Sequence, residues 1–218
     1  MTNERTHDNT ENKPYRIFLV RHGESARHES PVYLGQSDVP LSDHGRHEAA
    51  KAGKKLLKAG VSPKRIYSSD LSRASETAEI ITKSLRGTPV ILDKLFREMA
   101  MGSWDGELIE DIKVKFPGEY EKRGDDFRNY RTPGGENFYD LQGRVTREFH
   151  RIFAEDFRDF KNKGGDPGDL LIVAHLGVVT VLYEELTQAS ASKDGFWPHF
   201  KTGSVTEVKT PEWLWSRP

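Results

Sequence analysis

The chain of 218 residues contains no cysteine, which excludes disulfides, thiolate nucleophiles and zinc-thiolate sites. It also lacks a long apolar run. The longest stretch, "LLIVAHLGVVTVLY" at 170–183, is too short to cross a bilayer and contains a histidine and a glycine, so it indicates a strand, a turn and a helix. Residues 1–13 have mixed charge and no apolar segment typical of a secretory signal. We therefore expect a disordered N-terminal tail and a cytoplasmic protein.

An excess of either charge is missing as well, because 33 Lys and Arg residues nearly balance 34 Asp and Glu residues. The sequence therefore predicts no nucleic-acid partner and no membrane partner, and any anion site must be local. The length and the 35% hydrophobic content favour one domain, which we place at 14–210, followed by a C-terminal tail at 211–218. Nothing in the sequence indicates an oligomeric state.

Short apolar runs alternate along the chain with longer amphipathic segments. We expect strands at 17–20, around 66–67, at 90–92 and at 170–174. Helices are expected over 42–60 and 70–85, near 108–116, and from 137 and 177 onward, with Ser42 or Asp43 capping the first and Gly60 ending it. Alternating strands and helices predict an α/β layered domain with parallel strand pairing.

Polar residues follow two of the expected strands at their carboxyl ends. Arg21 and His22 follow the first strand, and His175 follows the strand at 170–174. Gly23 and Gly177 come soon after, and glycine permits a sharp turn and a close approach of the backbone to a ligand. Since open α/β sheets bind ligands at the carboxyl ends of their strands, both histidines are candidates for one site.

Arg73 adds a cation in the first turn of a helix that Asp70 or Ser72 is expected to cap. A cation there opposes the helix macrodipole, but a bound anion would reverse the effect. A phosphate group, which guanidinium binds well, fits this arrangement. We therefore predict a metal-free phosphate site from four side chains: Arg21, His22, Arg73 and His175.

Each of these residues also has an ordinary structural explanation when taken alone. A histidine after a strand is commonly packed or solvated, and Arg73 could be a surface charge. His44 and His47 lie on the exposed face expected for the first long helix, where no matching carboxylates suggest a metal site. The combination of the four side chains is what favours the phosphate site.

Three motifs in a fixed order make the chain resemble a known family. These are "LVRHGES" at 19–25, "SSDLSRASETA" at 68–78 and "VAHLGV" at 173–178, with "LFREMAMGSWDG" and "PGGEN" between the last two. From about residue 15 to 208 the sequence is similar to the histidine phosphatase superfamily, the phosphoglycerate mutase-like group. The resemblance implies a three-layer αβα domain with a mostly parallel central sheet.

The resemblance also implies a role for each catalytic candidate. His22 would be the nucleophile and form a phosphohistidine, while Arg21, Arg73 and His175 would bind the phosphoryl oxygens. Glu98, in "LFREMAMGSWDG", matches the proton donor of the family. The mechanism implied requires no metal and no cofactor.

Four further residues are expected to bind substrate. Gln36, Glu136 and Asn137 match segments that border the substrate pocket of the family, although turn chemistry alone would explain the glycines beside them. His28 stands three residues after the Ser of the first motif, where the family commonly has Asn. This departure bears on substrate preference and leaves the catalytic residues unchanged.

We expect a phosphomonoesterase that acts on a small phosphorylated metabolite. Mutases of the group generally carry a longer insertion after the acid, and the compact segment from Glu98 to Asn137 favours a phosphatase. A cofactor-dependent phosphoglycerate mutase stays an alternative, as do a metal-dependent hydrolase and a non-catalytic phospholigand-binding regulator on the same fold. A regulator would not require Glu98.

Overall fold

A five-stranded sheet forms the centre of the protein, in a computed structural model that describes residues 15–26, 30–163, 168–189 and 200–215. The strand order is β3-β2-β4-β1-β5. β1 (Arg16–Arg21), β4 (Leu170–Ala174), β2 (Ile66–Ser68) and β3 (Val90–Leu92) pair in parallel, and β5 (Val205–Lys209) adds an antiparallel edge. The prediction of a mostly parallel sheet is therefore confirmed.

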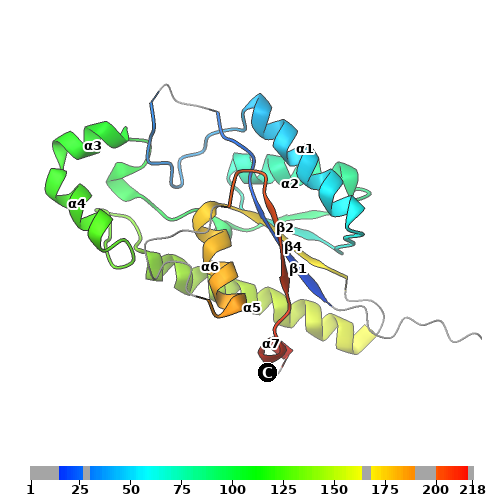
Figure 1. Cartoon of the computed structure of the whole chain (residues 1–218). Coiled ribbons are helices and arrows are strands. Elements are labelled where there is room, and N and C mark those ends of the chain that lie inside the picture. The colour runs from blue at the N-terminus through cyan, green and yellow to red at the C-terminus, as the bar shows by residue number, and fades with distance from the viewer. Residues whose placement is uncertain (1–14, 27–29, 164–167, 190–199, 216–218) are drawn as a thin grey trace, which may run out of the picture.

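Helices cover both faces of the sheet (Figure 1). α1 (Asp43–Lys58) and α2 (Ser72–Ser84) lie on one face, and α5 (Phe138–Lys163) and α6 (Leu176–Thr187) lie on the other. Alternate residues of β1 point to opposite faces, so Phe18 and Val20 pack with the first pair of helices. Ile17 and Leu19 pack with the second pair. This alternation joins the three layers of the domain.

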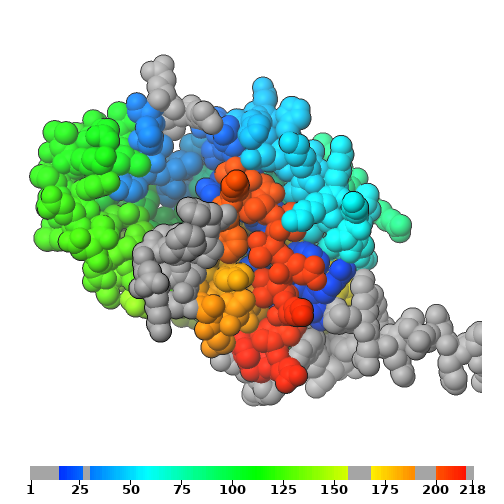
Figure 2. All heavy atoms as spheres, in the orientation of Figure 1, coloured from blue at the N-terminus to red at the C-terminus, as the bar shows by residue number. Residues whose placement is uncertain are grey.

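Two further helices lie to one side of these layers, α3 (Ile109–Lys115) and α4 (Pro117–Asp125) (Figure 1). Figure 2 shows this segment in green and the α1 segment in cyan as separate bulges on either side of residues that follow β1. The short 3-10 helices η1 (Lys94–Phe96) and η2 (Gly102–Trp104) lie in the connection from β3 to α3. α7 (Glu212–Trp215) falls within the expected C-terminal tail, and its Leu214 is buried in the core beside α5.

Three expectations about the elements were wrong or incomplete. The region near 108–116 was expected to hold one short helix, but α4 follows α3 directly; it has no buried residue and therefore no apolar stripe to reveal it. β5 was missed because only Val208 of its residues is buried. The N-cap of α2 is Leu71, not Asp70 or Ser72, and Asp38 from a distant loop accepts hydrogen bonds from Ser72 instead.

The expected cap of α1 is confirmed, because the Ser42 hydroxyl accepts a hydrogen bond from the Gly45 amide at 3.0 Å. The first turn of α1 also lies in close backbone contact with the segment after β1. A Cβ atom on Gly23 would lie 2.2 Å from the Gly45 carbonyl oxygen, so only glycine permits this approach.

Backbone hydrogen bonds align the carboxyl ends of β1 and β4. Arg21 pairs with Ala174 in the parallel register, and the His22 amide donates to the Ala174 carbonyl at 2.9 Å. His22 and His175, far apart in sequence, are thereby placed at the same edge of the sheet. No helix in the described ranges is long and apolar enough to cross a membrane.

Candidate active site

His22 lies directly after β1 and is buried. Its Nδ1 is 2.6 Å from the Gly23 carbonyl oxygen, which can only accept a hydrogen bond. Nδ1 therefore carries the ring proton, and the lone pair of the neutral imidazole is on Nε2. The local turn thus selects the tautomer that a nucleophilic Nε2 requires.

The surroundings of His22 favour its uncharged form. Burial and the positive charges of Arg73 and Arg21 lower its pKa to about 3, while the hydrogen bond to Gly23 acts in the opposite direction. Near neutral pH the imidazole is therefore unprotonated, and its lone pair is available.

His175, the N-cap residue of α6, packs against His22 with the ring centroids 5.1 Å apart. Its Nε2 lies 2.8 Å from the hydroxyl oxygen of Ser69, which also accepts a hydrogen bond from the Leu71 amide. Burial, followed by the charges of nearby groups that include His22 and Arg73, lowers the pKa of His175. Its Nδ1 is buried and has no hydrogen-bond partner within the described residues.

Two arginines complete the cluster that we call the phosphate site (Arg21, His22, Arg73 and His175). Arg73 is 1% exposed, and its Nη1 and Nη2 donate to the carbonyls of Ser37 at 2.9 Å and Gly35 at 2.7 Å. Arg21 donates through Nη1 to the Phe200 carbonyl at 2.7 Å.

Neither arginine of the phosphate site pairs with a carboxylate among the described residues. Burial lowers the pKa of both guanidinium groups, and the charge of Glu98 opposes that shift in each. The Nε atoms of Arg21 and Arg73 are buried without a hydrogen-bond partner in the described chain, as is Nδ1 of His175. Unpaired buried donors are rare in proteins, and a bound anion would satisfy those of the two arginines.

Arg73 is held in place by a loop at 35–37 that contains the carbonyls it contacts. The carboxylate of Asp105 accepts hydrogen bonds from the amides of Gly35 at 3.0 Å, Gln36 at 2.7 Å and Ser37 at 3.1 Å. A single carboxylate therefore fixes the loop whose opposite side holds the guanidinium.

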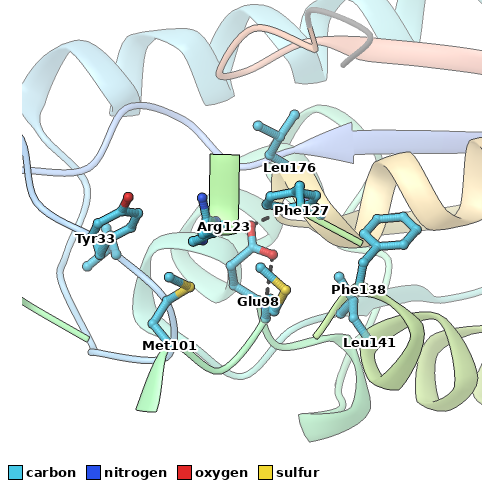
Figure 3. Close-up of a pocket in the computed structure, with 11 residues that line it drawn as sticks. Tyr33, Glu98, Met101, Arg123, Phe127, Phe138, Leu141 and Leu176 are labelled. Carbon is cyan, nitrogen blue, oxygen red and sulfur yellow. Dashed lines mark hydrogen bonds between the residues drawn. The ribbon is translucent and has the colours of Figure 1, made fainter. Parts of the chain in front are cut away.

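Glu98 lies between the phosphate site and a neighbouring hollow. Its carboxylate accepts hydrogen bonds from the Met99 amide at 2.8 Å and from the Gly177 amide at 3.2 Å in the first turn of α6. A Cβ atom on Gly177 would lie 2.4 Å from Oε1 of Glu98, so the glycine makes room for the carboxylate. Figure 3 shows Glu98 in the middle of the residues that line the hollow.

This hollow, the Glu98 cavity, has a volume of about 270 Å³. Among the described residues its lining contains two charged side chains, Glu98 and Arg123, and is otherwise mainly apolar, with Tyr33, Phe127 and Phe138 among its members. Arg123 and Phe127 come from α4 and the turn after it, so the segment beside the three layers forms one wall (Figure 3).

The backbone around Glu98 is tied to distant parts of the chain. Arg97 forms a two-pronged ion pair with Asp70, with both distances 2.6 Å. The Glu98 carbonyl accepts from Arg144 at 2.9 Å and from the Gln36 side-chain amide at 3.1 Å. These contacts fix the position of the Glu98 backbone, and with it the starting point of the candidate proton donor's side chain.

The residues expected to bind substrate have partners within the protein. Gln36 contacts the Glu98 carbonyl, as above, and Glu136 accepts from Arg144 and from the Ala100 amide. Asn137 caps α5 by accepting from the Asp140 amide at 2.9 Å. Contact of these three residues with substrate stays a prediction. His28 lies outside the described residues, as does the expected tail at 1–13.

Other groups bear on the expectations from the sequence. His44 is 63% exposed at its side chain, and the part of the chain that the structure describes holds no cluster of three or more potential metal ligands. Sequence reasoning missed Ser69, Asp105 and Arg123. The first two lie within the motifs "SSDLSRASETA" and "GSWDG", whereas Arg123 has no signal in the sequence.

Comparison with known proteins agrees with this geometry. The model of the histidine phosphatase superfamily (branch 1) matches residues 17–216, and this protein belongs to that family. A glucosyl-3-phosphoglycerate phosphatase of Mycolicibacterium vanbaalenii is 32% identical over 167 residues, which are 77% of this chain and 72% of the relative. Phosphoglycerate mutase-like protein 4 of Arabidopsis thaliana is also 32% identical, over 77% of this chain and 69% of its own.

Solved structures include phosphatases with the same fold. The native structure of a mycobacterial glucosyl-3-phosphoglycerate phosphatase superposes with a TM-score of 0.73 and 28% identity, over 88% of this chain and 89% of that one. A structure described as a putative alpha-ribazole-5'-P phosphatase of Escherichia coli gives a TM-score of 0.71 and 26% identity, over 89% of each chain. These relatives support phosphatase activity for the family member described here.

The low pKa of His22 predicts how stability depends on pH. In the unfolded chain this histidine takes up a proton near pH 6.5, but in the folded protein only near pH 3. Between these two pH values the unfolded chain binds the proton and the folded protein does not. The contribution of His22 to the free energy of unfolding is therefore complete above pH 6.5 and is lost as the pH falls from 6.5 toward 3. We expect His22→Gln to reduce the slope of unfolding free energy against pH in this window by up to about 1.4 kcal/mol per pH unit.

Urea unfolding of both proteins in phosphate-free buffer, at several pH values from 4.5 to 7.5, measures this slope. A bound anion would stabilise the folded state and obscure the difference, which is why phosphate is omitted. Parallel curves for wild type and variant would contradict a depressed pKa at His22.

Proposed function

We propose that this protein is a metal-independent phosphomonoesterase that acts through a phosphohistidine at His22 on a small phosphorylated metabolite. The observation that supports it most is the state of the phosphate site. A neutral imidazole with its lone pair on Nε2 lies beside Arg21, Arg73 and His175, each of which has a buried nitrogen without a hydrogen-bond partner among the described residues. Such a site provides a nucleophile and the charge to hold a phosphoryl group.

In the first step the Nε2 lone pair of His22 attacks phosphorus, and the bond from phosphorus to the ester oxygen breaks. The departing oxygen receives a proton from the Glu98 carboxyl group, which becomes a carboxylate. Arg21, Arg73 and His175 stabilise the charge on the three oxygens that stay with phosphorus. The tautomer that this role requires has the Ser69 hydroxyl donating to Nε2 of His175, which leaves the ring proton on Nδ1 for one of these oxygens.

In the second step water attacks phosphorus of the phosphohistidine and transfers a proton to the Glu98 carboxylate. The bond from phosphorus to nitrogen breaks, its electron pair returns to Nε2 of His22, and inorganic phosphate is released. Glu98 is again protonated, so the enzyme returns to its starting state.

The relatives divide between names that indicate a mutase and names that indicate a phosphatase. Structures described as phosphatases superpose over 88% or more of this chain. This agreement favours hydrolysis over phosphoryl transfer between substrates. A non-catalytic binding protein would have no use for a carboxyl group placed beside the phosphate site.

We test this function through the dependence of Glu98 on the leaving group. Alkyl phosphates release a basic alkoxide, so Glu98→Gln should slow the phosphorylation of the enzyme by them about 10²–10⁴-fold. Nitrophenolate departs without a proton, so p-nitrophenyl phosphate should be much less affected. Both rates are measured in single-turnover experiments, because the second step also uses Glu98.

Wild-type protein assayed with a chelator provides the reference, and Glu110→Gln, on the exposed side of α3, provides the control for loss of a carboxylate. No turnover of either ester by the wild type would overturn the function, and turnover that stops with chelator would overturn its metal independence. Equal loss with both esters in Glu98→Gln would assign Glu98 a structural role.

A further inference from the structure

Glu48 of α1 joins two segments that are far apart in the sequence. Its Oε2 accepts a hydrogen bond from the Glu24 amide at 2.8 Å, in the segment after β1. Its Oε1 accepts a hydrogen bond from the Thr202 hydroxyl at 3.0 Å, in the loop before β5. One carboxylate therefore links the chain that follows His22 to this second loop, which we call the 200–204 loop.

The 200–204 loop holds Arg21 through backbone groups. The Phe200 carbonyl accepts a hydrogen bond from Nη1 of Arg21 at 2.7 Å. The Gly203 amide donates to the carbonyls of Arg21 at 3.1 Å and His22 at 3.0 Å. A shift of this loop would therefore move the guanidinium of Arg21 relative to the nucleophile.

The 200–204 loop also packs closely on α1 (Figure 2). Gly203 has a φ of +66°, and a Cβ atom on it would lie 2.6 Å from the Cβ of Glu48. Glycine permits both the conformation and the approach. The side chain of Glu48 is 17% exposed, so its acceptors are directed mainly at protein donors and not at water.

Glu48 carries a negative charge near Arg21 as well. Burial lowers the pKa of Arg21, and the charges of Glu98 and Glu48 oppose this shift. A guanidinium stays protonated in either case, so Arg21 does not need Glu48 to keep its charge. The negative charge of Glu48 would also repel a phosphate dianion bound beside Arg21. What Glu48 can contribute to phosphate binding is therefore its two hydrogen bonds.

We infer, on the basis of the proposed function, that Glu48 is a positioning residue that places Arg21 for the phosphoryl group. It acts through Thr202 and the 200–204 loop on one side and through the Glu24 amide on the other. Glu48 itself does not touch the substrate.

Two substitutions separate the hydrogen bonds of Glu48 from its charge. In Glu48→Gln the amide oxygen can accept from the Glu24 amide, and the amide NH₂ can donate to the hydroxyl oxygen of Thr202. We expect this variant to bind inorganic phosphate as tightly as wild type or more tightly, because a negative charge is lost. Glu48→Ala loses both hydrogen bonds, and its dissociation constant for phosphate should rise about 10-fold or more. Isothermal titration calorimetry measures these constants without turnover.

A double-mutant cycle shows whether the effect passes through Arg21. In an Arg21→Ala background, Glu48→Ala should have little further effect, because the group that it positions is absent. Glu79→Ala, which removes an exposed carboxylate from α2, is the control and should leave the dissociation constant unchanged.

Three results would overturn the role of Glu48: weaker binding of phosphate by Glu48→Gln, unchanged binding by Glu48→Ala, or equal weakening by Glu48→Ala in both backgrounds. The first of these does not depend on the folding of the alanine variant. A wild-type protein that does not bind phosphate would instead count against the proposed function.

A second inference rests on the separate hydrogen bonds of Ser69. Its buried Oγ lies 2.8 Å from Nε2 of His175 and accepts a hydrogen bond from the Leu71 amide at 3.3 Å. Among the described residues these are its two partners. If Nε2 carried the ring proton, the hydroxyl would accept twice and its own proton would be buried without an acceptor, which is costly. We propose that Ser69 is a positioning residue that fixes neutral His175 with its proton on Nδ1.

Nitrogen-15 NMR of the histidine rings tests this proposal, because protonated and unprotonated ring nitrogens have different shifts. We expect wild type to hold His175 with Nδ1 protonated and Nε2 unprotonated, with the signals assigned by their loss in His175→Gln. Ser69→Ala removes the donor, so a population with Nε2 protonated should appear. Ser68→Ala is the matched control, since that buried hydroxyl donates to the Ser69 carbonyl at 2.9 Å.

The spectra decide the role of Ser69 without reference to turnover. A proton on Nε2 in the wild type, or the same tautomer in Ser69→Ala as in wild type, would overturn it. Equal changes in Ser69→Ala and Ser68→Ala would show a general effect on packing and would overturn it as well.

Discussion

Arg21 and Arg73 bring two positive charges into the interior beside His22, and only backbone carbonyls receive their hydrogen bonds among the described residues. A buried charge without a counter-ion is costly, and here burial lowers the pKa of both groups. The same charges keep His22 neutral. A phosphate dianion would supply the counter-charge, so its binding would offset part of the free-energy cost of burying the two guanidinium groups.

Several parts of the fold maintain this arrangement. The parallel register of β1 and β4 brings His22 next to His175, and the contact of Gly23 with Gly45 sets the path of the chain after β1. Asp105 fixes the loop that holds Arg73. Each contact joins segments that are distant in sequence, so the geometry of the site depends on the complete domain.

The candidate proton donor is positioned by a comparable set of contacts. Arg144 and Gln36 bind the Glu98 carbonyl, and the first turn of α6 binds its carboxylate. Glu98 thereby separates a highly polar phosphate site from a mainly apolar cavity. This division suits an ester whose two ends differ in polarity.

The sequence predicted those strands, and those site residues, that a pattern of neighbouring residues can reveal. β1 and β4 are continuous apolar runs, and the end of each strand predicted the positions of Arg21, His22 and His175 at one edge. β5 and α4 were not predicted, because they bury few or no residues and so have no periodic signal. The partnerships of Ser69, Asp105 and Arg123 are contacts between distant segments, which spacing along one chain cannot reveal.

The central claim is that His22 becomes phosphorylated, and mapping of the phosphoryl group during turnover tests it most directly. Wild-type protein mixed with a ³²P-labelled phosphate ester is quenched rapidly under alkaline conditions, where phosphohistidine survives, and its peptides are mapped. We expect label on the peptide that contains His22 and none on the corresponding peptide of His22→Ala. Label on a serine, on a carboxylate or on another histidine, or turnover by His22→Ala within about tenfold of wild type, would contradict the account.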